Sequence, residues 1–177
     1  LPTGVGTWPA IWMLGKNIDE DGGFWDNSGF GTTPWPACGE IDIMEHWGNN
    51  QNFVQSAMHT PSSFGNTINK GGQTISTVSS QFHIYTLEWT AERMIFSVDN
   101  VVHYIYNPIV KNATTWPFDA EQYFLLNEMI TIDIKVGDTI LGGKFKNKKI
   151  IVKHIEKNDK GDITINGKPL LRYRIIK

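Results

Sequence analysis

The sequence contains only one cysteine, Cys38, and carries a formal net charge of only −2. A single cysteine excludes an intrachain disulfide and leaves the redox compartment unidentified. No run approaches the roughly 20 apolar residues of a membrane-spanning helix, so we expect no membrane partner. No signal peptide is recognisable, but the chain opens at Leu1 instead of Met, which is compatible with a segment removed upstream. The small net charge by itself indicates neither nucleic acid nor a membrane as a partner.

This small net charge hides a sharp division along the chain. Residues 1–128 contain four Lys/Arg against 13 Asp/Glu, a net charge of −9, whereas residues 129–177 contain 12 against five, a net charge of +7. All seven tryptophans lie before Met129. The change in composition predicts a domain over residues 1–128 and a small basic module over residues 129–177. A chain of this size can bury a real core in such a domain.

The most informative stretch is an acidic segment at residues 40–46. Its alternation of polar and apolar residues indicates a strand with Glu40 and Asp42 on one face. In a regular strand Glu45 would point to the opposite face. A single bulge at Ile43–Met44 would return Glu45 to the carboxylate face, and bulges are frequent beside active sites.

Two carboxyl groups placed in this way can act together in catalysis. A retaining glycosidase holds its nucleophile and its acid/base about 5–5.5 Å apart. Asp42, near Glu40, could share a proton or a hydrogen bond with it, because like charges in proximity help to keep one member protonated. The alternative is a solvated acidic edge strand, but Ile41 and Ile43 indicate that the other face is core, and the tryptophans favour a sugar-binding cleft.

This segment also resembles a known family. Residues 40–45 are similar to the bulged E-x-D-x-x-E signature of glycoside hydrolase family 16, as found in laminarinases. Similar flanking segments are Thr7–Gly15, Trp35–Gly39 and Gln55–Thr60, and the resemblance runs from about Leu1 to Asn127. It implies a β-jelly roll whose concave sheet cleaves internal β-1,3-glucan linkages with retention of configuration.

The resemblance implies roles for individual residues. Glu40 would be the nucleophile, Glu45 the acid/base, and Asp42 the residue that holds Glu40 in position and modulates its charge. The residues expected to bind sugar are Trp8, Trp12, Trp35 and His59. For the tryptophans the alternative is ordinary core packing, and for the histidine it is a structural role.

The substrate class follows from the same resemblance. The bulged signature favours β-1,3-glucan, while mixed-linkage glucans and sulfated galactans are alternatives within the same fold, because loop shape decides among them. Such glucans lie outside the cytoplasm, which implies an extracellular or periplasmic protein. We expect a monomer that uses no metal ion or other cofactor.

The remaining pattern before residue 128 is all-β. Alternating segments with turn signals predict an antiparallel sandwich, with strands over residues 8–14, 53–60, 82–89, 93–99 and 101–106 and a turn at Asp99–Asn100. Polar loops at the cleft rim are expected over residues 15–34 and 61–80. Strands that the family has before Leu1 and after Asn127 are missing from the pattern, so we expect a sandwich truncated at both ends.

The pattern of residues 129–177 predicts a separate β module, which faintly resembles small SH3-like barrels. Hairpin turns are expected at residues 158–162 and 166–167. A basic patch of Lys144, Lys146, Lys148 and Lys149 could meet nucleic acid or an anionic polysaccharide. The alternative is a solubilising charged hairpin, because only Phe145 interleaves with the lysines and no stacking platform is evident.

Two other functions compete with hydrolysis. One is a non-catalytic glucan-binding module, whose expected mark would be loss of Glu40 or Glu45, and both are present. The other is an inactive truncated fragment in which the basic module binds an anionic polymer. The sequence therefore favours a retaining endo-β-1,3-glucanase.

Overall fold

The computed structural model describes residues 1–20, 22–25, 31–130, 134–143, 147–157 and 163–170. These residues form β-strands and loops, and none of them lies in a helix long and apolar enough to cross a membrane. The chain divides into two compact units, Leu1–Thr131 and Ile132–Lys177. Strand β8 (Gln122–Ile130) belongs to the first unit and crosses the change in composition after Glu128.

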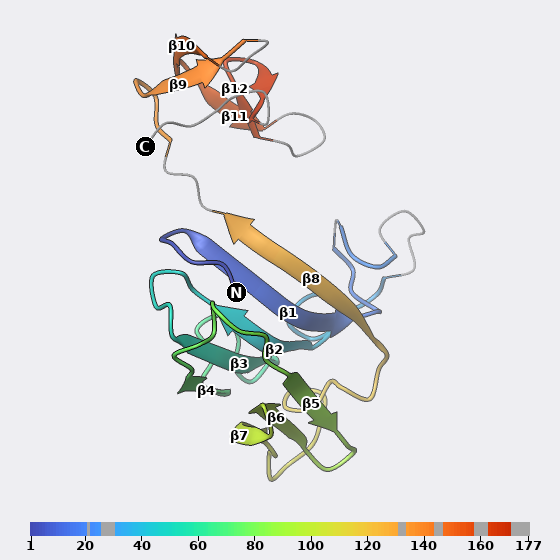
Figure 1. Ribbon diagram of the computed structural model, residues 1–177. Coiled ribbons are helices and arrows are strands. Elements are labelled where there is room, and N and C mark those ends of the chain that lie inside the picture. Colours follow the sequence, from blue (N-terminus) through green and yellow to red (C-terminus); the bar gives the residue numbers. More distant parts are fainter. Residues whose placement is uncertain (21, 26–30, 131–133, 144–146, 158–162, 171–177) are drawn as a thin grey trace. The chain divides into compact units, whose positions relative to one another are not determined.

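The first unit contains two antiparallel sheets (Figure 1). The larger sheet has the strand order β4-β3-β2-β1-β8, and its other strands are β1 (Thr7–Gly15), β2 (Glu40–His46), β3 (Phe53–His59) and β4 (Lys70–Thr74). The smaller sheet has the order β5-β6-β7, formed by β5 (Tyr85–Trp89), β6 (Met94–Val98) and β7 (Val101–Tyr106). The predicted all-β jelly-roll sandwich is confirmed.

The core lies between these sheets. From β2 and β3, the buried side chains of Ile41, Ile43 and Met58 pack in one cluster with Met94 and Phe96 of β6. Because successive side chains of a strand point to opposite faces, burial of the two isoleucines leaves the acidic residues of β2 on the other face of the sheet. The alternation in the sequence therefore places the apolar side chains of β2 in the core and its acidic side chains on the opposite face of the sheet.

A tight turn connects the strands of the smaller sheet as predicted. Asp99 and Asn100 have φ angles of 50° and 67°, the left-handed conformation that asparagine and aspartate tolerate better than other residues with a side chain. The Asp99 carboxylate also accepts hydrogen bonds from the backbone N–H of Ile84 and from the His83 ring. This turn sets the pairing of β6 with β7.

One expectation is wrong, because residues 61–80 are not entirely loop. β4 forms within them and pairs with β3 at the edge of the sheet. Its Gly71 and Gly72 leave no room for side chains, since an added Cβ would lie 2.8 Å from His103 O and 2.4 Å from Val54 O, respectively. Backbone pairing and close approach form this strand without the apolar alternation that would identify it in the sequence.

The second unit has a small apolar core of its own. Ile140, Val152 and Ile165 are buried together. Its strands are β9 (Thr139–Gly142), β10 (Lys148–Ile151), β11 (Ile155–Lys157), β12 (Ile163–Ile165) and β13 (Lys168–Pro169), in two sheets. The predicted turn at residues 166–167 is confirmed between β12 and β13. The predicted turn at residues 158–162, and Lys144 and Lys146 of the basic patch, lie outside the described residues, while Lys148 and Lys149 are exposed.

Candidate active site

The β-bulge predicted in β2 is present and determines which side chains meet. Asp42 pairs with Ala57 of β3 and Glu45 pairs with Gln55, so three steps along β2 oppose two along β3. The extra residue lies within Ile43–Met44, and both of these side chains are buried in the core. The bulge therefore returns Glu45 to the sheet face of Asp42, as predicted.

Glu40 and Glu45 each accept a hydrogen bond from a tryptophan side chain. Trp35 Nε1 donates to Glu40 Oε2 at 2.7 Å, and Trp8 Nε1 donates to Glu45 Oε1 at 3.1 Å. Gln55 Nε2 also donates to Glu45 Oε2 at 3.4 Å. Two of the predicted sugar-binding tryptophans thus contact the predicted catalytic carboxylates directly.

Trp12 lies on the same face but has a different environment. It is the register partner of Asp42 on β1, and its indole N–H donates to the side chain of Asn127 on β8. Its ring packs against the cluster that includes Leu14 and Cys38. Burial raises the pKa of the Cys38 thiol to about 11, in keeping with a packed and unreactive side chain.

A cleft of about 450 Å³ opens beside Glu40 and Glu45 and extends across β3 to β4. Trp8 and His59 line it as predicted. Sequence reasoning missed other residues of its wall, which are Trp47, Gln55, Ala57, Gly65, Asn66, Thr67 and Lys70. Trp47 packs against Trp8 with ring centroids 5.8 Å apart. The expected alternation of β3 placed Gln55 on the side of His59, and that signal could have identified it.

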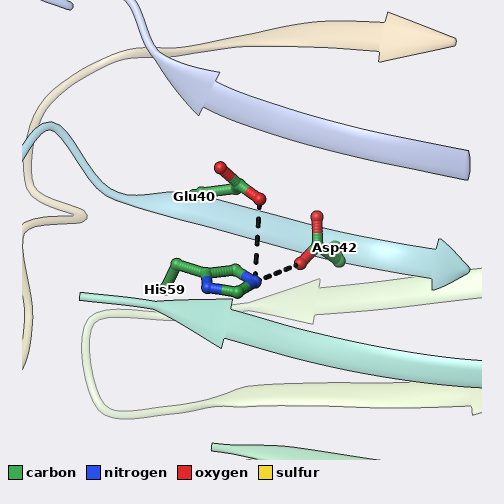
Figure 2. A group of neighbouring side chains, drawn as sticks. All are labelled: Glu40, Asp42 and His59. Atoms are coloured by element: carbon green, nitrogen blue, oxygen red, sulfur yellow. Dashed lines mark ion pairs between the residues drawn. The ribbon is translucent and has the colours of Figure 1, made fainter. Parts of the chain in front are cut away.

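His59 lies beside both Glu40 and Asp42. Its Nε2 is 3.1 Å from Asp42 Oδ2 and 3.7 Å from Glu40 Oε1 (Figure 2). The first distance is short enough for an ion pair, although no aligned hydrogen bond reaches Asp42 Oδ2 from the described residues. A small rotation of the ring would align the N–H of Nε2 with this oxygen. On the other side of the ring, the backbone N–H of Gly65 donates to Nδ1 at 3.0 Å.

Burial raises the proton affinity of all three carboxyl groups. Only 4% of Asp42 and 8% of Glu45 is exposed. Burial, and then the charge of Asp42, raise the pKa of Glu40 to about 7. The pKa of Asp42 lies well above its usual range, chiefly because of burial. Burial also raises the pKa of Glu45, but hydrogen bonds from Trp8 and Gln55 oppose the shift. The cluster is therefore suited to hold protons near neutral pH.

Glu40, Asp42 and His59 also present ligand atoms within 4.8 Å of one another, as a metal site would. A metal-binding histidine normally donates its second ring N–H to an acceptor. The second nitrogen of His59 instead accepts a hydrogen bond from Gly65. This arrangement favours a proton over a metal ion at Nε2.

Comparisons with known proteins agree with these features. The family model described as glycosyl hydrolases family 16 matches residues 1–125. The beta-glucanase of Rhodothermus marinus is 36% identical over 134 residues, which is 72% of this chain and 43% of that protein. The keratan-sulfate endo-1,4-beta-galactosidase of Sphingobacterium multivorum is 34% identical over 71% of this chain and 27% of its own length.

A solved structure is similar over the same region and beyond it. The laminarinase from Flavobacterium sp. UMI-01 superposes with a TM-score of 0.63 and 39% identity, covering 83% of this chain and 54% of that one. The chain thus spans about half or less of the length of these relatives.

Proposed function

This chain belongs to glycosyl hydrolases family 16, and from that premise we propose that it hydrolyses internal linkages of a β-glucan with retention of configuration. The observation that carries the proposal is the bulge in β2. It places Glu45 on the face of Glu40, and each carboxylate receives a tryptophan N–H beside one cleft. In a solvated acidic strand the carboxylates would be exposed, whereas Asp42 and Glu45 are buried here.

In the proposed reaction Glu45 is the acid/base. Protonated Glu45 gives its proton to the glycosidic oxygen as the bond to the anomeric carbon breaks, and the Glu40 carboxylate attacks that carbon to form a glycosyl ester. Water then attacks the same carbon while Glu45 takes its proton, which releases Glu40 and regenerates the protonated acid. Two displacements at one carbon retain its configuration.

Asp42 allows Glu40 to act as an anion. Beside a charged Asp42, Glu40 would be partly protonated at neutral pH, because burial and that charge raise its pKa to about 7. Asp42 is the more deeply buried of the two, so a shared proton is better placed on Asp42. Neutral Asp42 no longer repels charge on Glu40, and its hydroxyl can donate to Glu40. The Trp35 N–H supports the same anion from its other side.

We infer β-1,3-glucan as the substrate class. The support comes from the bulged signature and from the similarity to a laminarinase and a beta-glucanase. The similarity to a keratan-sulfate galactosidase keeps sulfated galactan as the comparison substrate. A substrate of this kind would place the protein outside the cytoplasm.

The first test is release of reducing ends from laminarin by the full chain, beside Glu40→Gln, Glu45→Gln and the exposed-site control Glu88→Gln. We expect activity in the parent and the control, and a loss of at least about a thousandfold in the two site variants. Circular dichroism checks that all four are folded. A folded parent chain that binds laminarin without cleaving it would overturn the proposal in favour of a binding module.

A second test separates the two roles by rescue with azide. With an activated glycoside, Glu40→Ala plus azide should give the glycosyl azide of inverted configuration, because azide replaces the nucleophile. Glu45→Ala plus azide should give the retained product, because azide replaces water in the second displacement. The exchanged pattern would reverse the assignment of Glu40 and Glu45.

A further inference from the structure

His59 is held between a backbone donor and two acids. Gly65 N–H donates to Nδ1 at 3.0 Å, while Nε2 faces Asp42 Oδ2 at 3.1 Å and Glu40 Oε1 at 3.7 Å. Only 9% of the histidine is exposed. Figure 2 shows Nε2 directed toward both carboxyl groups.

These contacts determine where the ring carries its proton. A neutral imidazole has one N–H donor and one lone-pair acceptor. Because a backbone N–H can only donate, Nδ1 must supply the lone pair, and the proton of His59 must be on Nε2. A proton on Nδ1 would place two donors against each other in a buried position, which is costly.

We propose that the backbone N–H of Gly65 is a positioning group for catalysis: it holds His59 as the Nε2–H tautomer, so that the ring presents a donor to the Asp42–Glu40 pair and stabilises the single negative charge that the pair carries. In this arrangement Gly65 donates to His59, His59 donates to Asp42 Oδ2, and the proton on the other oxygen of Asp42 is donated to Glu40. The proposal rests on the role given above to Glu40 as the nucleophile.

The direction of donation matters because a lone pair at Nε2 would face the oxygens of the two acids and repel their charge. An N–H at this position instead supports the negative charge that Asp42 and Glu40 share. The deep burial of Asp42 then favours the charge on Glu40, which borders the cleft and receives the Trp35 N–H. The charge then lies where the sugar carbon is to be attacked.

The loop that carries Gly65 is built to keep its N–H in place. Thr67 is buried and its hydroxyl donates to Met58 O at 3.0 Å, which ties the loop to β3 next to His59. The Asn69 N–H donates to the same hydroxyl, and the Ser63 and Thr67 hydroxyls are 3.0 Å apart. Gly65 has a φ of +65°, a conformation in which glycine is unstrained.

The tautomer can be measured without any catalysis. Nitrogen NMR of the full chain labelled in histidine should show His59 neutral, protonated at Nε2 and unprotonated at Nδ1, with Nδ1 coupled to the Gly65 amide. His59→Gln serves to assign the signal. A proton on Nδ1 of neutral His59 would overturn the proposal whatever the activity of the chain.

A matched pair of substitutions tests the consequence for Glu40. The amide of His59→Gln can reach the position of Nε2 and donate to Asp42, whereas the amide of His59→Asn reaches only the position of Nδ1. We expect kcat for laminarin to fall roughly 10- to 100-fold in His59→Asn and much less in His59→Gln, with KM little changed in both.

The pH profile separates this role from a merely structural one. The charged groups that face the pair are Glu45 on β2 and Lys70 on β4, and both are unchanged in these variants. Loss of the donor destabilises the negative charge that Asp42 and Glu40 share and raises the pKa at which the pair becomes charged, so the acidic limb of kcat/KM should move to higher pH in His59→Asn but not in His59→Gln. Equal profiles in the two variants would overturn the proposal. A parent chain without hydrolytic activity would instead contradict the proposed function, and the NMR result would stand by itself.

Discussion

The two sides of the cleft use the same pair of residue types, a glutamate and a tryptophan, in different surroundings. On the Glu40 side, which comprises Glu40, Asp42, Trp35 and His59, a second buried acid lies within contact of the first. On the Glu45 side, which comprises Glu45, Trp8, Gln55 and Lys70, the neighbours of the acid are hydrogen-bond donors and a cation. The difference teaches that the role of a carboxylate depends on its neighbours.

The comparison also resolves an apparent contradiction. A pKa of about 7 would usually mark a general acid, yet it belongs to the proposed nucleophile, Glu40. Burial, and then the charge of Asp42, raise the pKa of Glu40, so the two acids retain a proton between them, and the more buried member, Asp42, is the better place for it. Among the described residues, the hydrogen bonds to Glu45 come from Trp8 and Gln55 and not from a second acid, so a proton that Glu45 holds is available to the substrate.

Among the tests of this comparison, the largest effect is expected from removing one tryptophan N–H at a time. Trp35→Phe should lower kcat on laminarin roughly 10- to 100-fold, because the Glu40 anion loses a short hydrogen bond from a group that no other described side chain replaces. Trp8→Phe should cost several-fold less, since Gln55 still donates to Glu45. Steady-state kinetics measure both, and a larger loss in Trp8→Phe would break the comparison.

A middle-sized effect is expected on stability as pH changes. A folded pKa above the ordinary value means that the folded protein binds more protons than the unfolded one, so stability falls as pH rises from about 4.5 to about 7 through Glu40. Glu40→Gln should therefore raise the melting temperature at pH 8 by a few degrees, with a smaller gain at pH 5. The melting temperature at pH 8 should rise less in Glu45→Gln.

Tryptophan fluorescence reports this transition, because all seven tryptophans precede Met129 and so follow the unfolding of the first unit. The exposed Glu88→Gln variant should match the parent at both pH values. If Glu45→Gln gained more stability than Glu40→Gln at pH 8, the Glu40 side would not be the more strained of the two.

The smallest effect is expected from Lys70. This residue lines the cleft, and its charge lowers the pKa of Glu45. Lys70→Met should raise that pKa, so the alkaline limb of kcat/KM should move upward by a few tenths of a pH unit while the acidic limb, set by the Glu40 side, stays fixed. Movement of the acidic limb instead would mean that Lys70 acts on the other side.

The sequence predicted what depends on counting residues along one strand. The alternation at residues 40–43 and the extra residue before Glu45 were enough to predict the bulge and the common face. The turn at Asp99–Asn100 followed equally well from local chemistry. In each case the signal and the structure span only a few neighbouring residues.

Features that depend on distant partners escaped prediction. β4 forms because its glycines fit against β3 and β7. Its polar sequence has no apolar alternation from which a strand could be predicted. Lys70 reaches the cleft wall only through this strand. The role of Trp12 in sugar binding stays a prediction, but its hydrogen bond to Asn127, which lies 115 residues further along the chain, could not be foreseen.

The bulge in β2 has a consequence for how such a protein could change over generations. The bulge accommodates one extra residue between Asp42 and Glu45. Loss of the codon for Ile43 or Met44 would restore strict alternation, in which the three acids still share one face of the sheet. The catalytic face could therefore survive a change of one residue in the length of this stretch, whereas loss of both codons would turn Glu45 toward the apolar core.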